Sequence, residues 1–92
     1  PDLIVEVLSP STEAYDRGRK FEHYRALESL RAYLLVADDR VHGELYTRQP
    51  DREWILSEAS GLSKIIDLRS LECKLALSAI YDRVELPKSV VR

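Results

Sequence analysis

A carboxylate inside an apolar strand and a lysine on the next element are the residues of this chain with the clearest capacity for chemistry. Glu6 interrupts the apolar run of residues 3–8, and Lys20 lies in a helix-like segment further along the chain. A carboxylate binds hard cations such as Mg²⁺, and an ammonium group beside it can position or activate water. The pair therefore suggests half of a metal-dependent phosphodiesterase site.

Asp2 is a second acid of the same predicted strand, but its spacing separates it from Glu6. Side chains alternate along a strand, so the two carboxylates project from one face. Four residues of strand hold their backbones about 13 Å apart, whereas each oxygen bound to Mg²⁺ lies about 2.1 Å from the ion. A site centred on Glu6 therefore needs a second carboxylate from elsewhere. Asp38 and Asp39 are further candidates, although their predicted turn favours a solvated structural role.

The elements that must position this pair follow from local signals. Residues 2–8 are rich in Ile, Val and Leu and end at a proline, which predicts a strand. Its nearly continuous apolar run predicts a central strand that is buried on both faces. Ser11 or Thr12 is then placed to cap a helix that extends to about Leu27 or Glu28.

Lys20 borders the apolar stripe of the predicted helix. At 100° per residue it lies close to the line of Tyr24 and beside that of Phe21. The ordinary interpretation is a lysine whose stem covers the core while its ammonium group stays in water. Tyr24 is predicted to pack in the core with its hydroxyl at the edge of a cleft. Gly18 costs about 1 kcal/mol of helix propensity, which favours a close approach to another backbone at that point.

The remainder of the chain predicts a meander of strands and one short helix. We predict strands at Ala32–Ala37, Val41–Thr47, Trp54–Glu58 and Ser63–Leu68, separated by turn residues. Ser78 is placed to cap a helix at Ala79–Arg83, and residues from Val84 onward are predicted to form a loosely held tail. A single α/β domain spanning residues 1–92 is the simplest assembly of these elements.

Charge and hydropathy exclude several classes of protein. The formal charge of −2 means that the chain as a whole lacks the net positive charge typical of nucleic-acid-binding proteins. Four cations of the predicted helix are offset by four acids: Arg17, Arg19, Lys20 and Arg25 against Glu13, Asp16, Glu22 and Glu28. No segment approaches the roughly 18 apolar residues of a membrane span, and none has the pattern of a signal peptide. A cytoplasmic protein without a membrane span is therefore expected.

Cysteine and histidine add no catalytic motif of their own. The single Cys73 cannot form an internal disulfide, which fits a reducing compartment, and we predict a structural or incidental thiol. No motif links His23 or His42 to a nucleophile, so both are predicted to be surface or strand-face residues. A serine or cysteine hydrolase is accordingly disfavoured.

Several of these residues carry a resemblance to a known family. Residues 1–12, then Asp16, Lys20, Tyr24 and the segment 33–36, closely resemble the bacterial restriction endonuclease-like family of the PD-(D/E)XK nuclease superfamily. The resemblance implies an α/β fold in which a restriction endonuclease-like mixed sheet has a flanking helix and a C-terminal strand meander. In that superfamily, acids on two neighbouring strands bind Mg²⁺, and a lysine two residues after the second acid positions or activates water.

The resemblance also implies roles for individual residues. Glu6 matches the second acid, whereas Leu8 occupies the position of the superfamily lysine. In this family a lysine from the following helix replaces it, which corresponds to Lys20. The implied Mg²⁺ ligands are Glu6 and the backbone carbonyl of Val7. Asp2 is a further candidate, although the family's principal Asp usually lies on an earlier strand.

The implied function is hydrolysis of DNA phosphodiester bonds, with DNA as the partner. Family members are commonly longer, so we expect a partial domain that is truncated at its N-terminus and cleaves weakly or not at all. A strand without its hairpin neighbour would expose backbone groups that favour pairing with another chain, including a homodimer. The alternative function is a catalytically degenerate, nuclease-derived module for binding or dimerisation.

Overall fold

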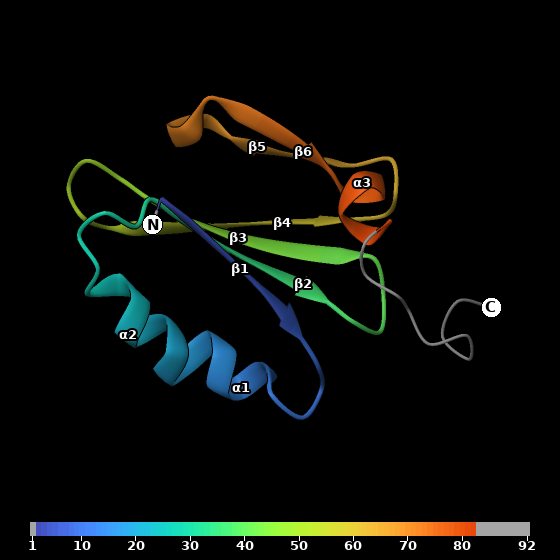
Figure 1. The fold of residues 1–92 in the computed structure, drawn as a ribbon, viewed down its shortest axis with the longest axis horizontal. Helices are drawn as coiled ribbons and strands as arrows, with labels where there is room; N and C mark the ends of the chain where they lie inside the picture. The colour runs from blue at the N-terminus through green and yellow to red at the C-terminus, as the bar shows by residue number, and fades with distance from the viewer. Residues whose placement is uncertain (1, 83–92) are drawn as a thin grey trace.

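One four-stranded sheet organises the protein (Figure 1). The computed structural model describes residues 2–82, apart from the side chains of Glu13, Asp16 and Ser70. The sheet has the spatial order of its strands in the chain: β1 (Leu3–Leu8), β2 (Ala32–Ala37), β3 (His42–Arg48) and β4 (Trp54–Ser60). β1 and β2 are parallel, and the other two pairs are antiparallel. The predicted mixed α/β fold is confirmed.

A continuous helical segment covers one face of the sheet. It consists of α1 (Glu13–Tyr15), the π-helix η1 (Asp16–Lys20) and α2 (Phe21–Arg25). The predicted extension to Leu27 or Glu28 was wrong, because the chain leaves the helix after Arg25 through a series of tight turns. Ser11 and Thr12 precede the helix in a turn where the hydroxyls of Ser9 and Thr12 bond to one another at 2.9 Å.

The predicted close approach at Gly18 was also wrong. A methyl group added at this glycine would meet no other atom within 4 Å. Gly18 lies within η1, where each turn holds more residues than an α-helical turn and so shifts the faces of the helix. Nothing in the structure explains why this position is a glycine.

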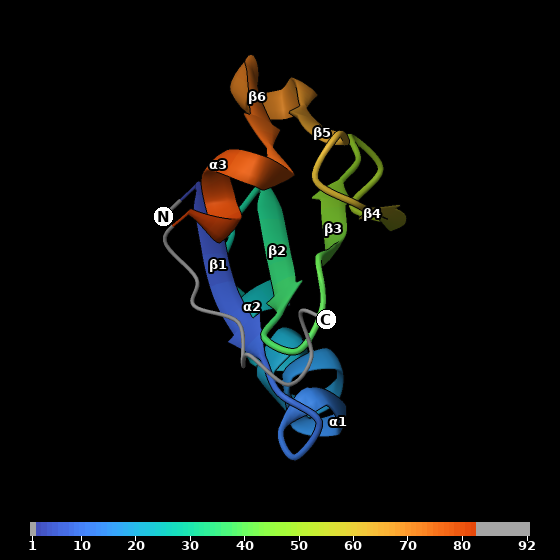
Figure 2. The same cartoon turned by 90° about the vertical axis from the view of Figure 1, so that its right-hand side faces the viewer.

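A small second sheet and a helix cover part of the opposite face (Figure 2). β5 (Ile65–Leu68) pairs antiparallel with β6 (Cys73–Ala76), and α3 (Leu77–Tyr81) follows directly. The short 3₁₀ helix η2 (Arg69–Leu71) joins the two strands through Glu72, whose φ of 54° reverses the chain. This left-handed residue is not a glycine or asparagine, so no turn signal predicted β6. Buried side chains join this layer to the sheet: Ala32, Leu34, Val36, Leu45, Ile66, Leu68 and Leu77.

The helix predicted near the C-terminus begins earlier than expected. Ala76 is the N-cap of α3, so Ser78 lies inside the helix and does not cap it. The Tyr81 hydroxyl lies within hydrogen-bond distance of the carbonyls of Ala37 and His42 and thereby joins α3 to the β2–β3 turn. Arg83 and the predicted tail from Val84 lie outside the described residues. No helix of the described part is long and apolar enough to cross a membrane.

β1 is an edge strand among the described residues, and not the central strand that its sequence predicts. Its side chains Ile4, Glu6 and Leu8 face the helical layer, but Val5 and Val7 are 48% and 50% exposed on the other face. By contrast, all six residues of β2 are buried, as predicted. Among the described residues, β1 is therefore covered along its helical face, whereas only Leu3 of the other face packs against the second layer.

An ion pair joins the helical layer to the middle of the sheet. Arg17 in η1 donates from Nε to Glu44 Oε1 on β3 at 2.9 Å, and from Nη2 to the other carboxylate oxygen. Glu44 is only 4% exposed. The hydrogen bonds from Arg17 lower the pKa of Glu44, although burial of the carboxylate acts in the opposite direction.

The contrast between β1 and β2 makes a first prediction. Val5 and Leu34 are cross-strand partners, but only Leu34 is fully buried. Leu34→Ala should lower the free energy of unfolding by about 2–5 kcal/mol, because it leaves a cavity between two layers. Val5→Ala should cost less than about 1 kcal/mol. Urea unfolding measures both, and equal losses would contradict the exposure of Val5 on the uncovered face of β1.

The Arg17–Glu44 pair makes a second prediction. Arg17→Met should lower the free energy of unfolding by about 1.5–3 kcal/mol near neutral pH, because it removes hydrogen bonds to a charged group. Since the pKa of Glu44 is lowered by folding, this stabilisation is present above the ordinary Glu pKa of about 4.3 and disappears as the pH falls through the folded value. The variant and wild type should therefore converge in acid, as measured by urea unfolding against pH.

The exposed Arg19 provides the matched control for this experiment. Arg19→Met should leave the free energy of unfolding within about 0.5 kcal/mol of wild type. A loss for Arg17→Met that is the same in acid as at neutral pH would contradict the assigned pair.

Candidate functional site

The predicted acid and lysine meet on the helical face of the sheet. Lys20 Nζ lies 2.9 Å from Glu6 Oε2, and the Tyr24 hydroxyl donates to Glu6 Oε1 at 3.0 Å. The side chains of Lys20 and Glu6 are 29% and 24% exposed, so the pair borders solvent. Each oxygen of the carboxylate thus has a separate donor from the helix, and Tyr24 packs against the core as predicted.

Local packing explains why these side chains converge. Ile4, Glu6 and Leu8 share one face of β1 because side chains alternate along a strand. The two apolar members pack in the cluster around Phe21 and Tyr33, whose rings are stacked with centroids 5.1 Å apart. This anchors the helix over β1, and Lys20 and Tyr24, four residues apart, both extend toward the acid.

The Tyr24 hydroxyl acts as a donor to Glu6, and its surroundings favour the protonated form further. Removal from water raises the pKa of Tyr24, and the hydrogen bond to Glu6 raises it further. The phenol of Tyr24 and the ammonium group of Lys20 therefore orient the carboxylate of Glu6. These two bonds occupy only part of its capacity as an acceptor. Such an acid can still accept a cation or a water molecule.

The backbone carbonyl of Val7 faces the open edge of β1. The carbonyls of Asp2 and Leu8 accept bonds from Ala32 and Asp38, on the side of β2. Carbonyl directions alternate along a strand, and the β1–β2 register is continuous, so the Val7 oxygen points the other way. No strand of the described residues pairs with that edge.

Asp2 and the two acids after β2 do not join Glu6. The Asp2 carboxylate lies 3.8 Å from Arg31 Nε and is 66% exposed, at the beginning of the strand. Asp39 pairs with its neighbour Arg40 at 3.0 Å, in the bend that follows β2. The spacing argument against joint chelation by Asp2 and Glu6 agrees with this arrangement.

The donor set at Glu6 fits one side of a Mg²⁺ ion. One carboxylate and one backbone carbonyl are hard oxygen ligands, and Mg²⁺ usually takes one or two protein carboxylates with waters and phosphate oxygens.

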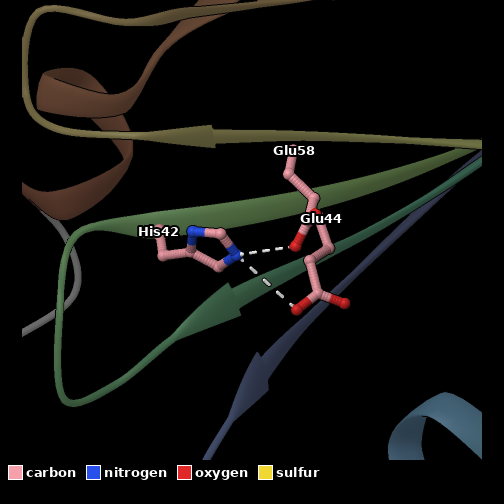
Figure 3. Close-up of side chains that lie close together, drawn as sticks. All are labelled: His42, Glu44 and Glu58. Atoms are coloured by element: carbon pink, nitrogen blue, oxygen red, sulfur yellow. Dashed lines mark hydrogen bonds and ion pairs between the residues drawn. The ribbon is translucent and has the colours of Figure 1, made fainter.

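A second cluster of potential ligands was missed by the sequence analysis (Figure 3). His42 Nε2 lies 3.6 Å from Glu44 Oε2 and 3.3 Å from Glu58 Oε1. His42 and Glu44 are two residues apart on β3, so their side chains share one face of the sheet. Glu58 on β4 is the cross-strand partner of Glu44. Both strands were predicted, but their register was not, so this proximity could not be inferred. The other histidine, His23, is exposed on α2, as predicted.

The two acid sites are related through the sheet. Glu6, Leu35 and Glu44 occupy one cross-strand row, with the leucine between the acids. The helix above them supplies one cation to each acid, Lys20 to Glu6 and Arg17 to Glu44. The row is therefore divided into two environments with separate charge partners.

Two curated relatives are similar in sequence to this chain over part of their own length. The uncharacterized protein slr1290 of Synechocystis is 42% identical over 81 residues, which cover 88% of this chain and 42% of the relative. The uncharacterized protein sll1609 of the same organism is 41% identical over 61 residues, 66% of this chain and 34% of the relative. The chain thus spans less than half the length of both.

A solved structure has the same fold. It is described as a putative nuclease belonging to DUF820 from Anabaena variabilis, and it aligns with a TM-score of 0.67 over 92% of this chain and 46% of its own. The identity is 14%, so the likeness concerns the fold. A family model described as "Uma2: Putative restriction endonuclease" matches residues 1–79. With most of its length covered by that model, the chain belongs to the Uma2 family of putative restriction endonucleases, as its opening segment suggests.

Proposed function

We propose that Glu6 and Lys20 are catalytic residues of a Mg²⁺-dependent nuclease that hydrolyses DNA phosphodiester bonds. The contact of 2.9 Å between the two side chains carries this proposal, because it joins a strand acid to a helix lysine at a solvent-accessible edge. Membership of the Uma2 family and the nuclease-like fold support the class of reaction.

The chain's own groups have distinct roles in this proposal. Glu6 and the Val7 carbonyl would hold Mg²⁺, which when bound neutralises phosphate charge and acidifies water. Lys20 would hold the attacking water by its ammonium group. The Tyr24 hydroxyl, 3.0 Å from Glu6 Oε1, would position the carboxylate and not touch the substrate.

The lysine must come from the helix because the strand cannot supply it. Leu8, at the position of the superfamily lysine, is 2% exposed and packs in the cluster with Phe21. A charged side chain in that place would be buried in an apolar environment at a large cost in free energy. Lys20 reaches Glu6 from above the sheet and avoids this burial.

A second metal-binding acid would complete the site from the free edge of β1. A strand that pairs with this edge would lie next to Glu6 and Val7, and its acid would approach them directly. The relatives offer additional chain from which such a strand could come, since they match this chain over 42% and 34% of their length. In the homodimer expected from the sequence, a second copy would occupy the same edge.

Cleavage of supercoiled DNA tests the proposed roles. In the presence of Mg²⁺, Glu6→Gln and Lys20→Met should each lower the cleavage rate by about 100-fold or more, the scale for loss of an acid–base group. Tyr24→Phe should have a smaller effect, about tenfold, because it only loosens the carboxylate. The exposed Lys64 provides the charge-matched control, and Lys64→Met should cleave like wild type.

Because this chain by itself is expected to cleave weakly or not at all, the assay should be run both on this chain and on slr1290, and the rate losses should be measured in slr1290 with the substitutions made at the matched residues. Removal of Mg²⁺ by a chelator should abolish cleavage in both. Unchanged rates in Glu6→Gln and Lys20→Met would overturn the site. If both wild-type proteins bind DNA without cleaving it, the proposed nuclease activity is wrong. That result would favour the catalytically degenerate binding module.

A further inference from the structure

We propose that His42, Glu44 and Glu58 bind a divalent transition-metal cation of the zinc class, at a site separate from Glu6 and Lys20. The three side chains offer one imidazole nitrogen and two carboxylate oxygens that all lie within 4.8 Å of one another (Figure 3). This proposal does not depend on the nuclease activity proposed above.

The spacing of the three groups fits a bound cation. Two ligands about 2.0–2.1 Å from a tetrahedral zinc ion lie about 3.3–3.4 Å apart. His42 Nε2 lies 3.3 Å from Glu58 Oε1 and 3.6 Å from Glu44 Oε2. These two separations are close to the zinc value, whereas the two carboxylate oxygens, which lie within 4.8 Å of each other, would have to adjust for both to bind the same cation.

The same distances fit a simple ion pair less well. A charge-assisted hydrogen bond from nitrogen to a carboxylate is usually about 2.7–2.9 Å long, shorter than either separation. Moreover, Nε2 carries at most one hydrogen, yet it faces an oxygen of Glu44 and one of Glu58. A cation could bind the nitrogen lone pair and one lone pair of each oxygen, in addition to the hydrogen bond that Glu44 Oε2 already accepts from Arg17.

The sheet orients the histidine for this role. His42 Nδ1 is within hydrogen-bond distance of the Ser60 hydroxyl, and the two residues are cross-strand partners. If Nδ1–H donates to that hydroxyl, the lone pair lies on Nε2, the atom that faces the acids. The adjacent cross-strand pair, Glu44 and Glu58, brings both carboxylates to the same face of the same two strands.

Charge and exposure define the class of cation. The two carboxylates and the Arg17 guanidinium on Glu44 together carry a net charge of about −1. This negative charge attracts a divalent ion. Imidazole selects Zn²⁺, Ni²⁺ or Cu²⁺ over Mg²⁺ and Ca²⁺. Glu58 is 55% exposed at its side chain, so a cation can enter and keep a water as its fourth ligand.

Zinc titration of the chain tests this site. Calorimetry should detect one equivalent of bound Zn²⁺, and the ion should raise the thermal unfolding midpoint of wild type. His42→Ala and Glu58→Gln should each weaken binding by about tenfold or more. Glu58→Gln changes a side chain that is half exposed, so it tests the site even if His42→Ala disturbs folding. Circular dichroism checks the fold of each variant.

Three control variants distinguish zinc bound at this cluster from zinc bound elsewhere on the chain. His23→Ala, on the exposed face of α2, and Glu53→Gln, before β4, should bind zinc like wild type. Glu22→Gln, at an exposed acid of α2 outside both clusters, should also leave zinc affinity unchanged. The proposal is overturned if folded wild type binds no zinc, if Glu58→Gln binds as tightly as wild type, or if His23→Ala weakens binding equally.

Discussion

The burial of Phe21 between the helix and the sheet is the contact on which both candidate sites depend. Its ring stacks on Tyr33, tilts against Tyr46 at 4.5 Å and meets the edge of Trp54 at 5.1 Å. Aromatic pairs of this kind stabilise by about 0.5–1.5 kcal/mol each beyond the area they bury. Because Phe21 directly follows Lys20, its position limits where Lys20 and Arg17 can reach on the sheet.

The acids beneath this helix require the cations that it carries. A carboxylate that is withdrawn from water loses free energy unless a charge or several hydrogen bonds replace the solvent. Glu44 is almost inaccessible to solvent, and both of its carboxylate oxygens accept hydrogen bonds from Arg17. The more exposed Glu6 accepts one hydrogen bond from Lys20 and one from Tyr24. The difference in burial leaves Glu6 open to solvent, which suits a site that exchanges water or substrate.

Strands with a strong local sequence signal were predicted well, but the burial of their faces was not. The bounds of β2 agree with the prediction residue for residue, since Ala32–Ala37 is an uninterrupted apolar run between polar turns. β1 has a similar composition, yet Val5 and Val7 on one face are about half exposed, because burial of that face depends on which other segments pack against it. β6 was missed since its preceding turn uses Glu72 in a left-handed conformation.

The sequence alone determined the alternation of β1, the apolar stripe of the helix and therefore which faces carry Glu6 and Lys20. It also separated Asp2 from Glu6, because residue spacing along a strand is set by covalent geometry. Only the tertiary structure decided that Lys20 touches Glu6 and that His42 meets Glu58. Those contacts depend on helix placement and strand register, which arise from packing between segments distant in the chain.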